Sequence, residues 1–254
     1  MMLSGLSLVI VTAVAFQNPA QTANGFRVPD RAVPAPTRSL SPETRGDIMM
    51  ARKMYREAID TYREAPQNSA VIQNKIGIAY HQLTELELAK KQYERSIKLD
   101  PKYAEAINNL GTIYYARKSY RRAINEYKKA IKMMPNMATF VGNLGTAYFA
   151  RKKFKEAALM YQEAIRLDPN VFDQSSNVGT TLQERSVEDR ARFHYIMAKT
   201  YAKAGENDRA LLYIRKALEE GFKDRQKFHT DPEFSALQSN TEFKQLMATE
   251  QRVL

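Results

Sequence analysis

The sequence has 254 residues, of which 44% are hydrophobic, so the chain can bury a core and is not disordered throughout. It contains no cysteine, which excludes disulfides, thiolate metal sites, cysteine nucleophiles and a lipid-modified cysteine anchor. Lys and Arg number 39 against 28 Asp and Glu, a formal net charge of +11, which keeps anionic partners in consideration.

The amino-terminal residues 1–20 are predicted to be a signal peptide. The first charged residue is Arg27, and the apolar run Leu8–Phe16 is shorter than the roughly 20 residues that a membrane-spanning helix needs. Ala13-Val14-Ala15 has the small-x-small pattern of a cleavage site, with Ala20 or Ala23 as alternatives. We therefore expect a periplasmic or secreted protein with no stable membrane span after cleavage.

One feature of a signal peptide is missing, because no Lys or Arg follows Met1. If Met1–Ala15 is not a functional signal, the segment is an apolar amino-terminal tail and the protein is cytoplasmic. Residues 21–40 contain scattered prolines and no apolar period, so we expect them to form a stiff, extended linker.

A period of 34 residues dominates the middle of the chain and predicts three regular units, at 70–103, 104–137 and 138–171. In the middle unit, Ile107, Leu110, Gly111 and Tyr114 form one face of a helix over Ala104–Ala116. Glycine is a poor helix former, so we expect another backbone to approach closely at Gly111. The residues that recur in register are Gly77, Gly111 and Gly145; Tyr80, Tyr114 and Tyr148; Ala89, Ala123 and Ala157; Tyr93, Tyr127 and Tyr161; and Pro101, Pro135 and Pro169.

This small, aromatic and proline pattern closely resembles the tetratricopeptide repeat (TPR) family. The resemblance implies an all-α fold, a right-handed superhelical solenoid of helix-turn-helix repeats with C-terminal capping helices. We expect a degenerate first unit at 41–69, where Ser41 is an N-cap and Pro42 the first helical residue.

The pattern weakens towards the carboxyl end. Residues 172–190 read as a polar insertion, and 191–222 as a degenerate fifth unit in which Ala198 replaces the glycine. Residues 223–254 are predicted to form two short helices that close the apolar end of the array.

The TPR resemblance also implies a concave groove lined by the first helix of each unit. Amides and hydroxyls there can pair with an extended peptide backbone, while Tyr115 and Phe149 can shelter apolar side chains. In the fifth unit, the equivalent surface carries Arg192, Tyr195, Lys199 and Lys203. The predicted peptide-binding residues are Asn74, Ile78, Asn108, Asn109, Thr112, Tyr115, Asn143, Thr146 and Phe149.

Asn109 and Asn143 occupy equivalent positions and are similar to the asparagine ladder with which the repeats of O-GlcNAc transferase grip peptide backbone. Lys75 and Ile196 stand at the equivalent places in two other units, so the alternative is that these asparagines are ordinary residues of the helix surface. The clamp that chaperone-adaptor TPR proteins use for acidic tails matches poorly, and we predict no chaperone-tail ligand.

The tripeptide Ala-Arg-Lys recurs at 51–53, 116–118 and 150–152, where each first helix is expected to end. Cations at this end complement the helix dipole. A basic edge along the array is the alternative interpretation.

No catalytic motif is present, and we expect neither enzymatic activity, nor a cofactor, nor a metal site. The three histidines, His81, His194 and His229, are isolated from one another, and His194 is expected in the core. The predicted function is a non-catalytic scaffold that binds protein or peptide partners, and we do not expect nucleic acid as its partner. The alternative is a basic solenoid that binds a polyanion such as nucleic acid or an anionic envelope polymer.

Overall fold

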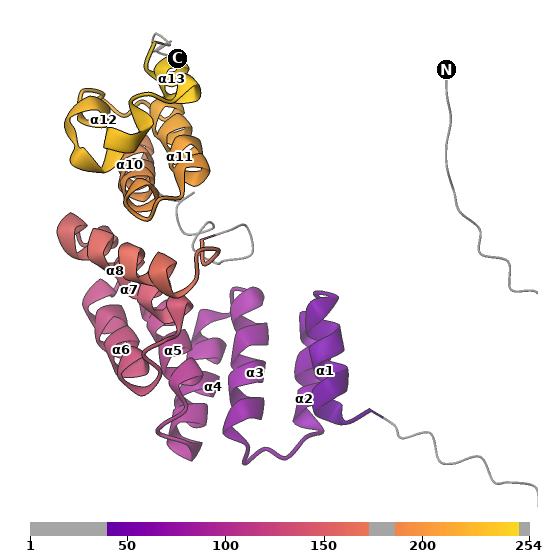
Figure 1. The fold of residues 1–254 in the computed structure, drawn as a ribbon. Helices are drawn as coiled ribbons and strands as arrows, with labels where there is room; N and C mark the ends of the chain where they lie inside the picture. The colour runs from indigo at the N-terminus through magenta and orange to yellow at the C-terminus, as the bar shows by residue number, and fades with distance from the viewer. Residues whose placement is uncertain (1–39, 173–185, 249–254) are drawn as a thin grey trace, which may run out of the picture. The chain divides into compact units, whose positions relative to one another are not determined.

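The computed structural model describes residues 40–172 and 186–248, and these are helical with turns and no strands (Figure 1). The predicted signal peptide and nearly all of the linker lie outside the described residues. The long helices are α1 (Pro42–Ala51), α2 (Tyr55–Arg63), α3 (Ala70–Gln82), α4 (Leu86–Leu99), α5 (Ala104–Ala116), α6 (Tyr120–Met133), α7 (Ala138–Ala150), α8 (Phe154–Leu167), α10 (Val187–Lys203) and α11 (Asn207–Glu219).

Consecutive helices pack as hairpins, namely α1 with α2, α3 with α4, α5 with α6, α7 with α8, and α10 with α11. Each second helix also packs on the first helix of the following hairpin, including α8 on α10. The described residues therefore confirm the predicted all-α architecture of stacked helical repeats.

In the first four units, the second helix presses a tyrosine ring against a glycine of the first. A β-carbon on Gly111 would lie 2.6 Å from Cε1 of Tyr127, closer than side chains approach. The expectation that another backbone approaches Gly111 is wrong, because a tyrosine ring fills the space. The other pairs are Gly46 with Tyr62, Gly77 with Tyr93, and Gly145 with Tyr161.

The helix ends follow from local sequence. Ser41 caps α1, accepting a hydrogen bond of 3.1 Å from the Thr44 amide, as predicted. Each first helix ends at a residue with a left-handed backbone, usually glycine's role. Here only the fifth unit has a glycine, Gly205; the other four residues are Lys53, Thr84, Lys118 and Lys152, with φ between 57° and 61°.

The carboxyl part of the array differs from the expected boundaries. Helix α10 begins at Val187, inside the segment predicted as an insertion, and Ser186 caps it by accepting from the Asp189 amide at 3.1 Å. Phe172, also assigned to that insertion, is buried with its ring 5.4 Å from that of Tyr161. Residues 173–185 lie outside the described part.

Between α11 and residue 248, where the described part ends, there are three short helical elements in place of the two predicted. They are α12 (Lys227–Thr230), the 3-10 helix η1 (Pro232–Leu237) and α13 (Thr241–Ala248). We call residues 221–248 the cap. Its fully buried side chains are Phe228, Phe234, Leu237 and Phe243, and η1 packs on α10.

Candidate functional site

The first helices α3, α5 and α7 carry almost no charge. With histidine neutral, their only charged side chains are Lys75 and Glu105. By contrast α6, a second helix, carries five basic residues and one acidic residue. The positive charge of the chain therefore lies mainly away from the first helices.

Four asparagines join consecutive first helices, and we call them the amide row. Asn109 on α5 donates from Nδ2 to Oδ1 of Asn74 on α3 at 3.0 Å, and Asn143 on α7 donates to Oδ1 of Asn108 on α5 at 3.1 Å. Asn108 in turn donates to Oδ1 of Asn109 at 3.3 Å. The row fixes both the spacing of the helices and the orientation of the amides.

In each hydrogen-bonded pair of asparagines, one side chain is buried and the other is partly exposed to solvent. Asn74 and Asn108 are buried, whereas Asn109 and Asn143 are partly exposed. An asparagine amide has two donor hydrogens and an acceptor oxygen with two lone pairs. Asn109 and Asn143 therefore keep hydrogen-bonding capacity on the solvent side.

The hydroxyls and apolar groups predicted for the groove fall into two sets. Ile78, Thr112 and Tyr115 are partly exposed beside the amide row. Thr146 is buried and donates to the carbonyl of Gly142 at 3.0 Å. Five of the nine predicted residues thus reach solvent, and we call them the exposed groove set: Ile78, Asn109, Thr112, Tyr115 and Asn143.

Phe149 is the fourth buried member of the predicted set, with 2% of its surface exposed. Its ring lies 5.2 Å from that of Phe154 and 5.7 Å from that of Phe193 on α10. The chain's own rings therefore occupy the space that we had assigned to an apolar ligand group.

Lys75, on the first helix α3, is neutralised by two carboxylates of α1. Its ammonium lies 2.7 Å from both Glu43 and Asp47 of α1, and Tyr62 donates to Asp47 at 2.7 Å. Burial acts to raise the pKa of Asp47, but the hydrogen bonds from Lys75 and Tyr62 outweigh it and lower the pKa. This cluster offers no free cation to an anionic ligand.

The cap covers the equivalent face of α10. Lys199 lies 2.9 Å from Asp231 and 3.2 Å from Glu233, and Tyr195 donates its hydroxyl to Asp231. Burial acts to lower the pKa of Lys199, but the hydrogen bonds to Asp231 and Glu233 outweigh it and raise the pKa. An acidic segment of the chain itself therefore occupies this part of the first-helix surface.

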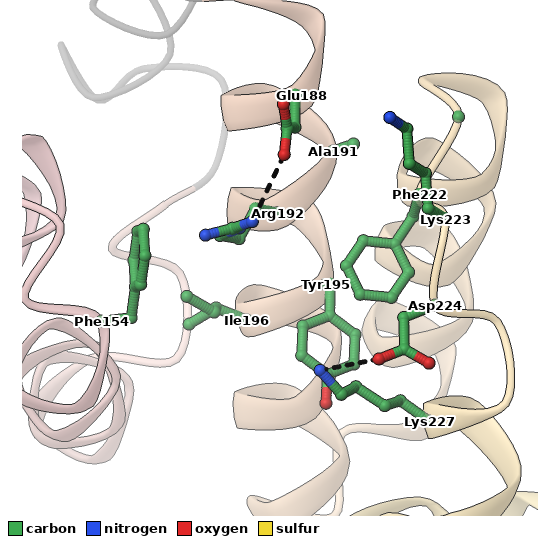
Figure 2. A pocket seen from close by; sticks show the side chains of 11 residues that line it. Phe154, Glu188, Ala191, Arg192, Tyr195, Ile196, Phe222, Lys223, Asp224 and Lys227 are labelled. Carbon is green, nitrogen blue, oxygen red and sulfur yellow. Dashed lines mark hydrogen bonds and ion pairs between the residues drawn. The ribbon is translucent and has the colours of Figure 1, made fainter.

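A pocket of about 380 Å³ opens on α10, on the amino-terminal side of Lys199 (Figure 2). We call it the α10 pocket. It is lined from three elements: the start of α8, the amino-terminal half of α10 and the beginning of the cap. The lining residues are Phe154, Glu188, Ala191, Arg192, Tyr195, Ile196, Gly221, Phe222, Lys223, Asp224 and Lys227.

Sequence reasoning placed Arg192 and Tyr195 on the first-helix face but missed the rest of this pocket. Phe154 was part of a regular repeat, and Phe222–Lys227 belonged to the fifth unit and the expected cap. No periodic signal marked them, because their meeting depends on how the cap folds back over α10.

The histidines form no site together. His194 is largely buried, with Nδ1 3.0 Å from Glu220 Oε2, and burial lowers its pKa, as it does for His81. Nδ1 of His229 lies 3.2 Å from Oε1 of Gln238. Residues 40–172 and 186–248 contain no cluster of three or more His, Asp or Glu side chains suited to a metal ion.

Three family models match the chain, and together they cover most of the stacked hairpins. Two described as "Tetratricopeptide repeat" match residues 114–171 and 191–220, and one described as "TPR repeat" matches residues 77–117. The chain belongs to the tetratricopeptide-repeat family. TPR proteins generally mediate protein–protein interactions, so the chain is a protein-interaction scaffold in this general sense.

Among curated relatives, this TPR protein is 32% identical over 74 residues to the uncharacterized protein ycf37 of Porphyra purpurea. The match spans 24% of this chain and 43% of that protein, so it covers less than half of the relative's length.

Solved structures of MamA show similarity to this TPR protein. The crystal structure of MamA is 23% identical with a TM-score of 0.48, covering 70% of this chain and 95% of that one. MamA 41-end from Desulfovibrio magneticus RS-1 is 17% identical with a TM-score of 0.49, covering 72% and 94%. In the described part of the present TPR protein, no helix is long and apolar enough to cross a membrane.

Proposed function

We propose that this TPR protein is a non-catalytic scaffold that binds an extended segment of a partner protein along its first helices. The observation that carries the proposal is the amide row. Its two partly exposed members, Asn109 and Asn143, are held in place by hydrogen bonds to Asn74 and Asn108. Fixed donors and acceptors pair with a peptide backbone at a low entropic cost.

The surroundings of the amide row suit a peptide better than a charged polymer. The near-neutral surface of α3, α5 and α7 imposes little desolvation of charge, and Ile78 and Tyr115 add partly exposed apolar area. Backbone hydrogen bonds would supply affinity, and these side chains would supply specificity.

The partner is identified by photo-crosslinking from the first-helix face. A photoreactive amino acid replaces Tyr115 on α5 or, as a control, the exposed Asn125 on the second helix α6. We expect a discrete protein product from position 115 in the native cell and none from position 125. Equal products from both positions contradict binding along the first helices.

The purified partner then tests the role of the amides with two matched double variants. Asn109→Ala with Asn143→Ala and Asn74→Ala with Asn108→Ala remove the same two inter-helix hydrogen bonds. Only the first pair removes the partly exposed amides. If the amides bind the ligand, the first double variant loses at least about tenfold more affinity than the second; equal losses show that the row serves only the stacking of repeats.

The alternative function is binding of a polyanion, and the charge on α6 favours it. Arg121, Lys128 and Lys132 are exposed there, so an anionic polymer would bind this helix and not the first-helix face. Affinity for a single-stranded oligonucleotide or an anionic polysaccharide should then fall steeply between about 50 and 200 mM salt. Affinity that is insensitive to salt eliminates this alternative.

We also propose that the chain is exported, on the basis of the sequence of residues 1–20. Amino-terminal sequencing of the mature protein from the native cell tests this, with a new terminus expected after Ala15, Ala20 or Ala23. A protein that retains Met1 in the cytoplasm contradicts export and favours the polyanion alternative.

A further inference from the structure

The geometry of the α10 pocket points to a specific anchor in the partner, and this inference rests on the proposed function. We propose that the pocket binds an aromatic side chain that lies next to a carboxylate in the partner's segment. A peptide that follows the first helices towards α10 would end its contact there.

The walls of the pocket are aromatic. Tyr195 and Phe222 stack with their rings 4.5 Å apart and 11° from parallel, and Phe154 lies beyond Arg192 and Ile196 from them (Figure 2). Ala191 and Ile196 complete the apolar lining. A pocket of a few hundred Å³ with apolar walls and a few polar groups is typical of sites that enclose an organic side chain or small ligand.

Arg192 is the polar group best placed to meet a ligand in this pocket. Its guanidinium lies over the Phe154 ring at 4.8 Å, and 41% of the side chain is exposed. Its only ion pair among the described residues is with Glu188, at 3.4 Å. Because a guanidinium binds a carboxylate through two parallel hydrogen bonds, Arg192 retains the capacity for a second, better-aligned partner.

The charges around the pocket favour a carboxylate over a phosphate. Lys227 pairs with Asp224 at 2.9 Å, while Lys223 is exposed. The lining thus holds three cations and two carboxylates, a small positive excess. A single carboxylate matches that excess of one charge, whereas a doubly charged phosphate would exceed it and leave uncompensated negative charge beside Glu188 and Asp224.

Where the cap contacts α10, it places a carboxylate and an aromatic ring against a cation of that helix. Arg192 and Lys199 are seven residues apart on α10, with Tyr195 between them on the same face. Lys199 and Tyr195 bind Asp231, and the ring of the nearby Phe234 lies 6.3 Å from that of Tyr195. This face of α10 therefore already binds one segment with an acidic and an aromatic residue, in the cap. Arg192, Phe154 and Phe222 form a second site where such a segment could bind.

A peptide with the sequence of residues 230–236, Thr-Asp-Pro-Glu-Phe-Ser-Ala, serves as the probe, with a fluorescein label at its amino end. Fluorescence anisotropy with the full chain is expected to show half-saturation below about 1 mM. Two further peptides replace either Phe with Ala or both acids with their amides, and each should bind at least about tenfold more weakly.

The protein variants locate the binding. Arg192→Gln is expected to weaken the parent peptide at least about tenfold, whereas Arg121→Gln, which removes an exposed arginine from α6, leaves affinity within about twofold. Lys199→Gln loosens the contact with the cap and should leave affinity unchanged or raise it. Weaker binding to Lys199→Gln than to Arg192→Gln would show that the peptide replaces the cap instead of filling the pocket, and overturns the proposal.

The proposal is also overturned if the peptide fails to saturate, if Arg192→Gln and Arg121→Gln bind equally, or if the peptide without its ring binds as well as the parent. The proposed function is judged separately, from the affinity of the crosslinked partner for the asparagine double variants. Loss of affinity in Asn109→Ala with Asn143→Ala but not in Arg192→Gln would retain the scaffold and remove the anchor.

Discussion

Tyr127 places its ring against the position that a β-carbon on residue 111 would take, with Cε1 only 2.6 Å from it. The same distance of 16 residues separates glycine and tyrosine in the first four units. In the fifth unit the two positions hold Ala198 and Ile214, both fully buried. A larger residue on the first helix is therefore matched by a smaller one on the second.

Gly111→Ala is expected to destabilise the protein, although alanine is the better helix former. Alanine gains about 1 kcal/mol in helix propensity, but overpacking a filled core costs about 1–3 kcal/mol. The tyrosine cannot yield easily, because it is almost fully buried. Urea unfolding of the variant measures the net loss.

Adding Tyr127→Ile to Gly111→Ala reproduces the pair found in the fifth unit. We expect the double variant to be more stable than the sum of the two single changes predicts, since each removes part of the other's clash or cavity. Strictly additive free energies in this double-mutant cycle would show that the ring and the glycine are not coupled.

The repeating contacts explain why the fold could be predicted from the sequence. Gly111 and Tyr127 recur in register because each unit repeats the same hairpin, and Ala104–Ala116 is a helix with the predicted bounds. What the pattern could not show is which side chain contacts the glycine. A 34-residue period fixes equivalent positions but not the partner across the hairpin.

Lys118→Gly is expected to stabilise the protein by about 0.5–1 kcal/mol, because glycine adopts the left-handed backbone without the steric cost that Lys118 bears. Its φ is 57°, and Gly205 occupies the equivalent place in the fifth unit. Lys91→Gly, an exposed change inside α4, is the control and should cost about 1 kcal/mol. Thermal unfolding compares the two; a loss at both positions would contradict relief of strain.

Acid is expected to loosen the cap from α10. Burial acts to raise the pKa of Asp231, but hydrogen bonds from Tyr195 and Lys199 outweigh it, so the pKa is lowered. A lowered carboxyl pKa contributes stability above the unfolded value of about 3.9, and this is lost as the pH falls through the folded value. Lys199 has a raised pKa, so its contribution is present below about 10.4 and lost at higher pH.

Asp231→Asn tests this pH dependence. The variant should unfold at a lower temperature than the wild type at pH 7, and the difference should shrink between about pH 5 and pH 2. Asp60→Asn removes an exposed carboxylate paired with Arg63 and should change the melting temperature little at either pH. A difference between Asp231→Asn and wild type that stays constant with pH would contradict the ionic role of Asp231.

The candidate site was less accessible to sequence reasoning than the fold. Asn109 and Asn143 were identified from their repeat positions, but their pairing with Asn74 and Asn108 depends on the distance between neighbouring hairpins. Phe149 was assigned to the groove, yet Phe193 reaches it from α10, beyond a segment that breaks the 34-residue period. Once the period is broken, sequence spacing no longer gives the register of the next hairpin.

Phe234→Ala in the cap is expected to destabilise the fifth unit by about 3–5 kcal/mol, the usual cost of truncating a buried phenylalanine. Phe234 is fully buried, with its ring 5.4 Å from that of Phe228. Leu212→Ala is the control, since Leu212 is 44% exposed and its truncation should change stability by less than about 0.5 kcal/mol.

Repeat proteins are stabilised mainly by nearest-neighbour contacts, so the loss of stability in Phe234→Ala should stay close to the cap. Hydrogen exchange should therefore become faster in α10 and α11 and remain unchanged in α3 and α4. Faster exchange throughout the chain would show that the array unfolds as one cooperative unit, and unchanged exchange in α10 would show that the cap does not protect that helix.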